Sequence, residues 1–504
     1  MSFWMKMARS QDRSTTISDA LDQKQKAQNR LTQLEKANDI LGSVFTHLDP
    51  KANFHTVAEL RNALKENLKQ AIAQLDGNVI GDPLTVAKMQ NILGESLIGL
   101  GEAELAIEVF ARKKNIAQAN LAADHPDTLI SMNNLAAAYY AAGKLEQALA
   151  IYEETLKFQK AKLGADHPDT LISMNNLALG YKDAGYLDKA IPLFEETLKL
   201  TKAKLGPDDP STLISMNNLA LGYKAAEKLD LALPLYEETL KLSKAKLGTD
   251  HPDTLNCMNN LALGYRSAGK LDLALPVYEE TLKLSKARLG ADHPLTLYCM
   301  GNLAASYRIA GKLDLALPIA EENLKLRKSK LGGDHPDTLD AMGSMGAAYS
   351  AAKQGEKAAL IFKEFVAARR KRGPQEDPQF AGLLAKVSLD LLKCDQFTAA
   401  EEMLRECLAI REKKEPNIWS TFNTQAILGV ALLGQKKYAE TEPLLLKGYE
   451  GMKAREKTIP PQATTRLPEA LDRLIQFYTE TNKPDEVKKW QAEREKYPKL
   501  PEKK

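Results

Sequence analysis

HPDTLISMNNLA, at His125–Ala136, is the stretch that decides the fold, because it returns along the chain at a fixed interval. The copies begin at His167, His251, His293 and His335, and Asp209 fills the same position in the unit between them. The period is 42 residues, and Pro168–Asp209 and Pro210–His251 are identical at 32 of 42 positions. A fixed period of this length is typical of a solenoid, in which each unit buries its apolar face against its neighbours.

The apolar residues within one unit recur at helical spacing. A first stripe comprises Leu129, Met132, Leu135, Ala136 and Tyr139, and a second comprises Leu145, Ala148, Leu149, Tyr152, Leu156 and Leu163. Gly143-Lys144 separates the two stripes, and Gly164 follows the second. This spacing predicts two helices per unit, and therefore an all-α fold built from about ten helix-turn-helix repeats.

The recurring histidines invite a metal-site interpretation, which the repeat spacing argues against. Metal ligands must lie within about 2 Å of one ion, whereas equivalent atoms of packed neighbouring repeats lie about 10 Å apart. Each histidine precedes a proline and, in most copies, an acidic residue, as at the start of a helix. We therefore expect a structural role there, and we likewise expect Cys257 and Cys299 to be buried apolar residues rather than a disulfide.

Composition excludes several classes of protein. The 504 residues carry 69 basic and 66 acidic side chains, a net charge of +3, so a nucleic-acid-coating protein is not expected. Four cysteines exclude a disulfide scaffold, and no apolar run has the length of about 18 residues that a membrane span needs. We found no phosphate-binding loop, zinc-protease motif or nucleophile elbow. The sequence thus predicts a cytoplasmic, non-enzymatic protein without a cofactor or a metal.

The unit resembles a tetratricopeptide repeat of the kinesin light chain type. Met132, Leu135, Ala136, Tyr139, Ala148 and Tyr152 carry the resemblance, together with NNLA in the first helix and LG-x-DHP between units. It implies a right-handed superhelical solenoid whose first helices line a concave groove. We expect the repeat array at 83–377, with its strongest repeats at 126–335, and degenerate repeats with a cap at 378–504.

The N-terminal flank suggests a further helix. Its apolar residues Ile17, Ala20, Ala27, Leu31, Leu34, Leu41, Phe45 and Leu48 follow a heptad, with Lys24 and Asn38 as polar core positions. A helix at 1–50 could form a homodimeric coiled coil through 17–48 or pack on the first repeat, and 51–82 would be a helical linker or cap.

Two stretches outside the strong repeats resemble the tails of planctomycete-type bacterial Ser/Thr protein kinases. They are Lys36–Pro50 and the region from Glu406 onward. The resemblance implies a region that docks on a kinase system, with a kinase as a partner in trans. The kinase motifs G-x-G-x-x-G, H-R-D and D-F-G do not occur in the chain, so no catalytic residue carries over.

The candidate binding residues form columns on the first helices, on the face that the apolar stripe leaves free. Two asparagine columns comprise Asn133, Asn175, Asn217 and Asn259, and Asn134, Asn176, Asn218 and Asn260. Four residues beyond the first column lie Leu179, Leu221 and Leu263, and seven beyond it lie Lys182, Lys224, Arg266 and Arg308. Spacings of four and seven place these residues on one helix face. Gly301 and Gly343 replace asparagine later in the array, so the site should centre between Ile172 and Arg308.

These residue types suit an extended peptide. An amide offers both donors and an acceptor to a peptide backbone, leucine adds apolar contact, and lysine and arginine favour acidic segments. Comparable residues of the kinesin light chain family bind cargo peptides, so the resemblance implies the same role here. The alternatives are that the asparagines only bridge neighbouring helices, that the chain is the sensing tail of a kinase system, or that it is a homo-oligomeric structural protein.

Overall fold

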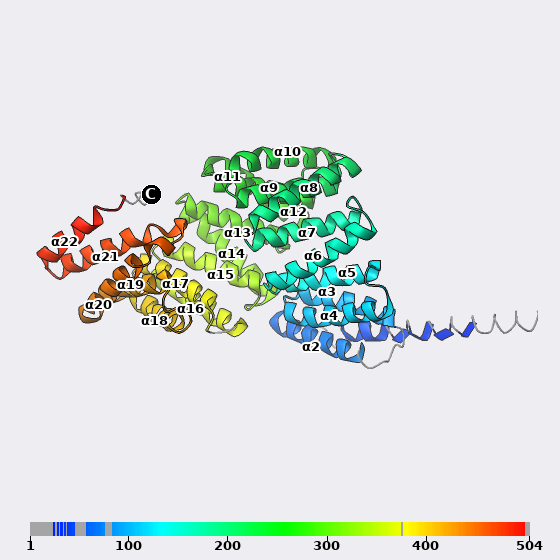
Figure 1. Cartoon of the computed structure of the whole chain (residues 1–504), viewed down its shortest axis with the longest axis horizontal. Helices are drawn as coiled ribbons and strands as arrows, with labels where there is room; N and C mark the ends of the chain where they lie inside the picture. The colour runs from blue at the N-terminus through cyan, green and yellow to red at the C-terminus, as the bar shows by residue number, and fades with distance from the viewer. Residues whose placement is uncertain are drawn as a thin grey trace, which may run out of the picture. The chain divides into compact units, whose positions relative to one another are not determined.

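The computed structural model of the chain is entirely helical over the residues that it describes. These are residues 24–25, 28–29, 31–33, 35–36, 38–45, 57–75, 83–373 and 376–498, and they contain no strand. They confirm the predicted all-α class of helix-turn-helix repeats. The chain divides into two compact units, unit 1 (Met1–Arg288) and unit 2 (Leu289–Lys504), and Figure 1 follows both from blue to red. The domain boundaries expected from the sequence stay a prediction.

Unit 1 begins its helical array with α2 and continues in pairs. Its helices are α2 (Val57–Leu75), α3 (Pro83–Gly99), α4 (Ala103–Asn120), α5 (Pro126–Ala141), α6 (Leu145–Lys162), α7 (Pro168–Asp183), α8 (Leu187–Leu205), α9 (Pro210–Ala225), α10 (Leu229–Leu247), α11 (Pro252–Ser267) and α12 (Leu271–Leu289). In each pair the odd-numbered helix is called the first helix and the even-numbered helix the second.

Unit 2 continues the same alternation of first and second helices. Its helices are α13 (Pro294–Ile309), α14 (Leu313–Leu331), α15 (Pro336–Ala351), α16 (Gly355–Arg372), α17 (Pro378–Lys393), α18 (Phe397–Lys414), α19 (Trp419–Gly434), α20 (Tyr438–Lys453), the short 3₁₀ helices η1 (Glu456–Thr458) and η2 (Pro461–Ala463), α21 (Arg466–Glu480) and α22 (Pro484–Arg494). In the part of the chain that the structure describes, α3 to α22 thus form ten pairs.

The repeated histidines start the first helices, as the sequence predicts. His251 is the N-cap of α11, and its Nδ1 accepts a hydrogen bond of 3.2 Å from the backbone N–H of Asp253. Asp209 does the same for α9, where its carboxylate accepts from Ser211 at 2.8 Å. An N-cap side chain satisfies one of the backbone N–H groups that a helix start leaves without a partner. Two different side chains therefore perform one task at this position.

The turn inside each pair requires one residue in the left-handed region. Gly185 and Gly269 adopt φ values of 83° and 73° there. At the same position Glu227 and Lys353 adopt 60° and 58°, a conformation that a residue with a Cβ occupies at a cost of about 1–2 kcal/mol. The turn geometry is therefore kept even where the sequence lacks the residue that suits it best.

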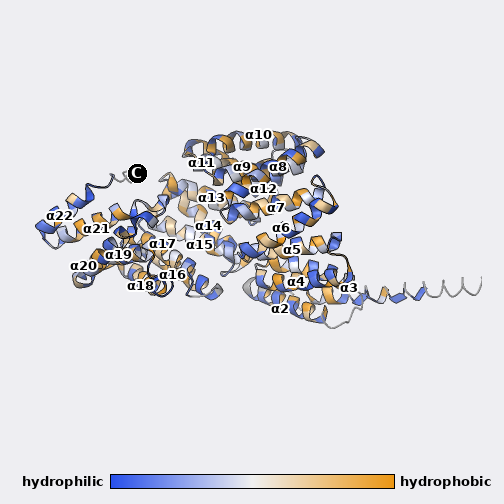
Figure 2. Cartoon of the chain, in the orientation of Figure 1, coloured by the Kyte–Doolittle hydropathy of each residue, from blue (hydrophilic) through white to orange (hydrophobic). Residues whose placement is uncertain are grey.

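Aromatic rings of the second helices lie at the centre of the packing. Phe194, Tyr236, Tyr278 and Phe362 occupy equivalent positions and are at most 1% exposed. Glycine in the following first helix makes room for the ring: a Cβ at Gly222 would lie 3.0 Å from the ring of Phe194. Figure 2 shows hydrophobic and hydrophilic residues mixed along the helices, as expected when only one side of each helix is buried. No helix in the described residues is long and apolar enough to cross a membrane.

The N-terminal segment packs on the array where it is described. Ile40 and Val44 are buried in one apolar cluster with Leu68 of α2 and Leu93 of α3. Leu31 and Phe45 are 51% and 72% exposed. The other heptad residues Ile17, Ala20, Ala27, Leu34 and Leu48 lie outside the described residues, so the coiled coil stays a prediction.

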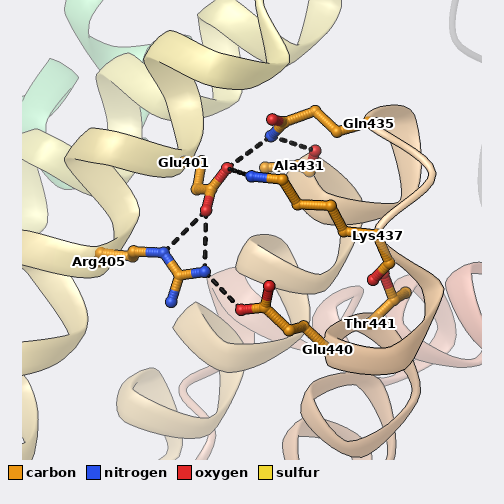
Figure 3. Close-up of polar contacts among 7 residues, drawn as sticks. All are labelled: Glu401, Arg405, Ala431, Gln435, Lys437, Glu440 and Thr441. Carbon is orange, nitrogen blue, oxygen red and sulfur yellow. Dashed lines mark hydrogen bonds and ion pairs between the residues drawn. The ribbon is translucent and has the colours of Figure 1, made fainter.

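A carboxylate network joins the last repeats of unit 2. Glu401 of α18 is 8% exposed and accepts hydrogen bonds from Arg405, Gln435 and Lys437, and Arg405 also pairs with Glu440 (Figure 3). Burial alone would raise the pKa of Glu401, but the three hydrogen bonds outweigh it and lower the pKa to about 2. Glu401 therefore remains ionised and ties α18 to the turn between α19 and α20, while Arg405 reaches Glu440 of α20.

Candidate functional site

The predicted binding residues lie on what we call the first-helix face, which consists of the fifth, eighth, ninth, twelfth and fifteenth residues of each first helix. In unit 1 this face is carried by α5, α7, α9 and α11, whereas Arg308 lies on α13 of unit 2. Residues at these spacings share one side of a helix. Each unit's face is described separately below.

The two asparagine columns are bonded to each other. Asn218 Nδ2 donates to Asn175 Oδ1 at 2.9 Å, and Asn260 Nδ2 donates to Asn217 Oδ1 at 3.1 Å. The second-column amide of one repeat therefore pairs with the first-column amide of the preceding repeat. Such bonds satisfy amides that packing has removed from water. The structure thus gives these asparagines the helix-bridging contacts that were one of the two sequence interpretations.

The ladder extends one repeat further toward the N-terminus than the sequence analysis proposed. Asn134 Nδ2 donates to Asn91 Oδ1 in α3, and the buried Lys113 donates to the same oxygen at 2.6 Å. Burial lowers the pKa of Lys113 to about 8. Asn91 stands 42 residues before Asn133, so the repeat period could have identified it.

Burial of the amides increases along unit 1. Asn217, Asn218, Asn259 and Asn260 are between 0% and 8% exposed, whereas Asn133, Asn134, Asn175 and Asn176 are only half-buried. Asn133 Nδ2 donates to Ser173 Oγ at 2.8 Å. Amides that could reach a ligand are therefore those of α5 and α7.

The basic column gathers positive charge in unit 1. Burial lowers the pKa of Lys224, and the positive charges of Arg266 and Lys182 lower it further. Lys182 pairs with the carboxylate of Asp183, which also accepts from the Tyr140 hydroxyl. Lys224 forms no ion pair within the described residues. An anion brought beside Lys224 would offset the cost of burying its charge and would counter the repulsion from Arg266 and Lys182.

Sequence reasoning missed an apolar row on the same face. Ile130, Ile172 and Ile214 are 45%, 57% and 47% exposed, and each stands three residues before a first-column asparagine. Their half-buried counterparts Leu179, Leu221 and Leu263 lie on the other side of the amides. The recurrence of Ile130, Ile172 and Ile214 at the 42-residue period was the available signal.

The loss of asparagine in unit 2 has a packing cause. A Cβ at Gly301 would lie 3.2 Å from Asn323 Nδ2, and one at Gly343 would lie 3.5 Å from the Phe365 ring. In unit 1 the position of Asn323 and Phe365 holds the smaller threonines Thr155, Thr197, Thr239 and Thr281. A larger side chain from the second helix therefore takes the space that the asparagine fills in unit 1.

Cysteine and histidine carry no chemistry that we can identify. Cys257, Cys299, Cys394 and Cys407 are buried free thiols, and burial raises the pKa of Cys257. Within the described ranges no three His, Cys, Asp or Glu side chains gather in a way that could hold a metal ion.

Comparison with known proteins supports the repeat assignment. A family model described as "Tetratricopeptide repeat" matches overlapping segments that together span residues 85–371, and a second model of the same description matches residues 381–414. A search of curated proteins returns no match.

Solved structures similar to this chain include other repeat proteins. A putative kinesin light chain of Podosopora anserina with nearly identical TPR-like repeats is 27% identical, with a TM-score of 0.36, over 40% of this chain and 96% of that one. BtubC (BKLC) of P. vanneervenii is 20% identical, with a TM-score of 0.38, over 45% of this chain and 92% of that one. Rap protein, solved with competence and sporulation factor, is 10% identical, with a TM-score of 0.47, over 77% of this chain and 98% of that one.

Proposed function

The chain belongs to the tetratricopeptide repeat family, and we propose that it is a non-enzymatic cytoplasmic scaffold that binds an extended, acidic segment of a partner protein. Binding takes place on the first-helix face of unit 1. Repeats of this family generally bind protein or peptide partners, and the acidic character of the partner is our own inference.

The observation that carries the proposal is the state of Lys224. The residue is half-buried, the positive charges of Arg266 and Lys182 act on it, and it forms no ion pair within the described residues. A partially desolvated cation interacts with a carboxylate more strongly than an exposed one does, because less water screens the charges. An acidic side chain that reaches Lys224 therefore gains more than it would from an ordinary surface lysine.

The remaining residues of the face would supply the rest of the contact. The exposed Ile130, Ile172 and Ile214 offer apolar area along one margin, and the half-buried amides of α5 and α7 offer donors to a peptide backbone. The buried amides of α9 and α11 would act indirectly, by holding neighbouring first helices together. A partner segment of alternating acidic and apolar residues fits this order.

The test uses a labelled peptide of five Glu-Leu pairs and measures fluorescence anisotropy. We expect saturable binding that weakens at least tenfold in the Lys182→Glu, Lys224→Glu, Arg266→Glu variant, with unchanged helicity by circular dichroism. The matched control is Lys199→Glu, Lys241→Glu, Lys283→Glu, which makes the same charge change at exposed positions of the second helices. Equal affinity in the first variant and the wild type, or equal losses in both variants, would contradict the proposal.

Docking on a Ser/Thr kinase is a second candidate, supported by the resemblance of Lys36–Pro50 and of the region from Glu406 to kinase tails. Reading the DNA upstream of Met1 tests it directly. An open frame that encodes kinase motifs would make this chain part of the kinase, whereas an adjacent separate kinase gene would favour a partner in trans. If the upstream DNA shows neither arrangement, the kinase proposal loses its support.

A further inference from the structure

Asp183 is an acidic residue at a helix end where helix electrostatics disfavours one. It is the last residue of α7, and a helix carries negative partial charge at that end. One repeat period later the same position holds Ala225 in α9, and two periods later it holds Ser267 in α11. Because a residue that breaks a local rule is often kept for a contact outside its own helix, we asked what the Asp183 carboxylate touches.

The Asp183 carboxylate bridges two neighbouring first helices. Its Oδ2 accepts a hydrogen bond from the Tyr140 hydroxyl of α5, and its Oδ1 accepts one from the Lys182 ammonium of α7. Burial and the neighbouring carboxylate raise the pKa of Tyr140, so its hydroxyl stays a donor. Tyr140 and Lys182 are the fifteenth residues of their helices. We call the place between the fifteenth residues of two consecutive first helices a bridging position.

The next two bridging positions of unit 1 have a cation on each side. Lys182 and Lys224 flank the one at α9, and Lys224 and Arg266 flank the one at α11. The residues that correspond to Asp183 there are alanine and serine, and both are exposed, so a carboxylate from outside the chain could reach these positions. Burial and the like charges of Arg266 and Lys182 lower the pKa of Lys224, as expected for a cation that lacks a counter-ion.

We propose that Asp183 is a built-in counter-ion that occupies the bridging position at α7 and directs the carboxylates of an acidic ligand to those at α9 and α11. A ligand carboxylate takes there the place that Asp183 takes at α7, with a cation from one first helix on each side. The acidic segment is therefore held in one register, instead of sliding along the whole basic column. The inference rests on the proposed function, because it assigns positions to the acidic residues of that same ligand.

The first experiment measures how tightly the labelled Glu-Leu peptide binds two variants of the full chain. Asp183→Asn keeps an oxygen acceptor for the Tyr140 hydroxyl but removes the charge, so it should free the α7 position and tighten binding at least threefold. Ala225→Asp copies the counter-ion into α9 and should weaken binding at least tenfold, with unchanged helicity by circular dichroism. The matched controls are Asp188→Asn and Ala245→Asp, which make the same charge changes at exposed positions of the second helices α8 and α10.

A second readout needs no peptide. Titration of Lys224, followed by NMR of isotope-labelled lysine, should show its pKa rising in Ala225→Asp and unchanged in Ala245→Asp, because a carboxylate at the bridging position stabilises the charged ammonium. An unchanged pKa in Ala225→Asp, or peptide affinities of the two variants equal to those of their controls, would overturn this inference alone. If the wild type does not bind the peptide, the acidic-segment proposal fails together with it.

Discussion

The first-helix faces of the two units use one scaffold for different surfaces. In unit 1 the amides of α7, α9 and α11 form a bonded ladder beside exposed isoleucines and a basic column. In unit 2 Gly301 and Gly343 replace the first-column amides, and Asp340 stands where α5, α7 and α9 have isoleucine. Burial raises the pKa of Asp340 although Arg369 and Lys386 lower it. The comparison teaches that the buried apolar stripes of the helices fix the fold. Residues of the first-helix face can differ between repeats, and they change together with the second-helix side chains that pack against them.

The largest expected effect is a loss of stability when the buried ring of Phe362 in unit 2 is removed. Phe362→Ala should lower the free energy of unfolding by about 3–5 kcal/mol, because the ring is 1% exposed and packs closely on Gly346. Urea unfolding with hydrogen exchange of α15 and α16 measures the loss and its location. Leu360→Ala in the same helix is the control, since Leu360 is 71% exposed, and should change stability by no more than about 0.5 kcal/mol. Equal losses of stability in Phe362→Ala and Leu360→Ala would mean that the buried Phe362 ring does not stabilise unit 2.

The next effect concerns the carboxylate network that unit 2 has at α18 and α20. Glu401→Gln should cost about 2 kcal/mol at neutral pH, since hydrogen bonds to a buried charge are lost. Glu401 has a folded pKa of about 2 against its ordinary 4.5, so its contribution is complete above pH 4.5 and disappears as the pH falls to 2.

Urea midpoints measured from pH 7 to pH 2 check this dependence. The difference between the wild type and Glu401→Gln should shrink below pH 4.5, whereas exposed Glu402→Gln should have little effect throughout. A difference that stays constant with pH would show that the network contributes nothing through its charge.

A smaller effect is expected from the amide ladder of unit 1. Asn217→Ala should destabilise the chain by about 1–2 kcal/mol, because it leaves the buried Nδ2 of Asn260 without its acceptor. A double-mutant cycle with Asn260→Ala should yield a coupling of about 1 kcal/mol. Additive losses would mean that the 3.1 Å bond contributes no stability of its own.

The smallest effect distinguishes the two units at their turns. Glu227→Gly in unit 1 should stabilise the chain by about 1 kcal/mol, since glycine adopts the observed φ of 60° without the Cβ penalty. Lys353→Gly in unit 2 should gain less, because the Lys353 ammonium donates a hydrogen bond to the Lys393 carbonyl that the variant loses. Thermal melts compare the two, and a larger gain at Lys353 would contradict this ranking.

The sequence analysis was most successful where one local rule acts. The histidine and aspartate N-caps, the helix pairing and the all-α class follow from the repeat period and from helix-start chemistry within a few residues. The columns of asparagine, leucine and lysine also lie on one face, because helix geometry fixes which side chains share it. The family match over residues 85–371 agrees with the resemblance that those motifs indicated.

Partnerships across repeats could not be predicted in the same way. Which asparagine of a pair faces the preceding helix depends on the rotation of each helix in its packing, and the role of Asn91 and Lys113 depends on the same detail. The isoleucine row was visible in the sequence, but its exposure was not. Whether an apolar side chain on a helix is covered depends on the neighbouring helices that pack against it.

The sequence alone thus determined that this protein is a helical repeat array whose first helices carry ordered columns of amide, apolar and basic residues. Tertiary structure decided that the amides bond to each other and that Lys224 forms no ion pair among the described residues. The physical reason is that helix periodicity is a property of consecutive residues. Burial and pairing instead depend on how closely side chains 28 to 43 positions apart approach one another, as in the Tyr265–Glu237 and Asn260–Asn217 contacts.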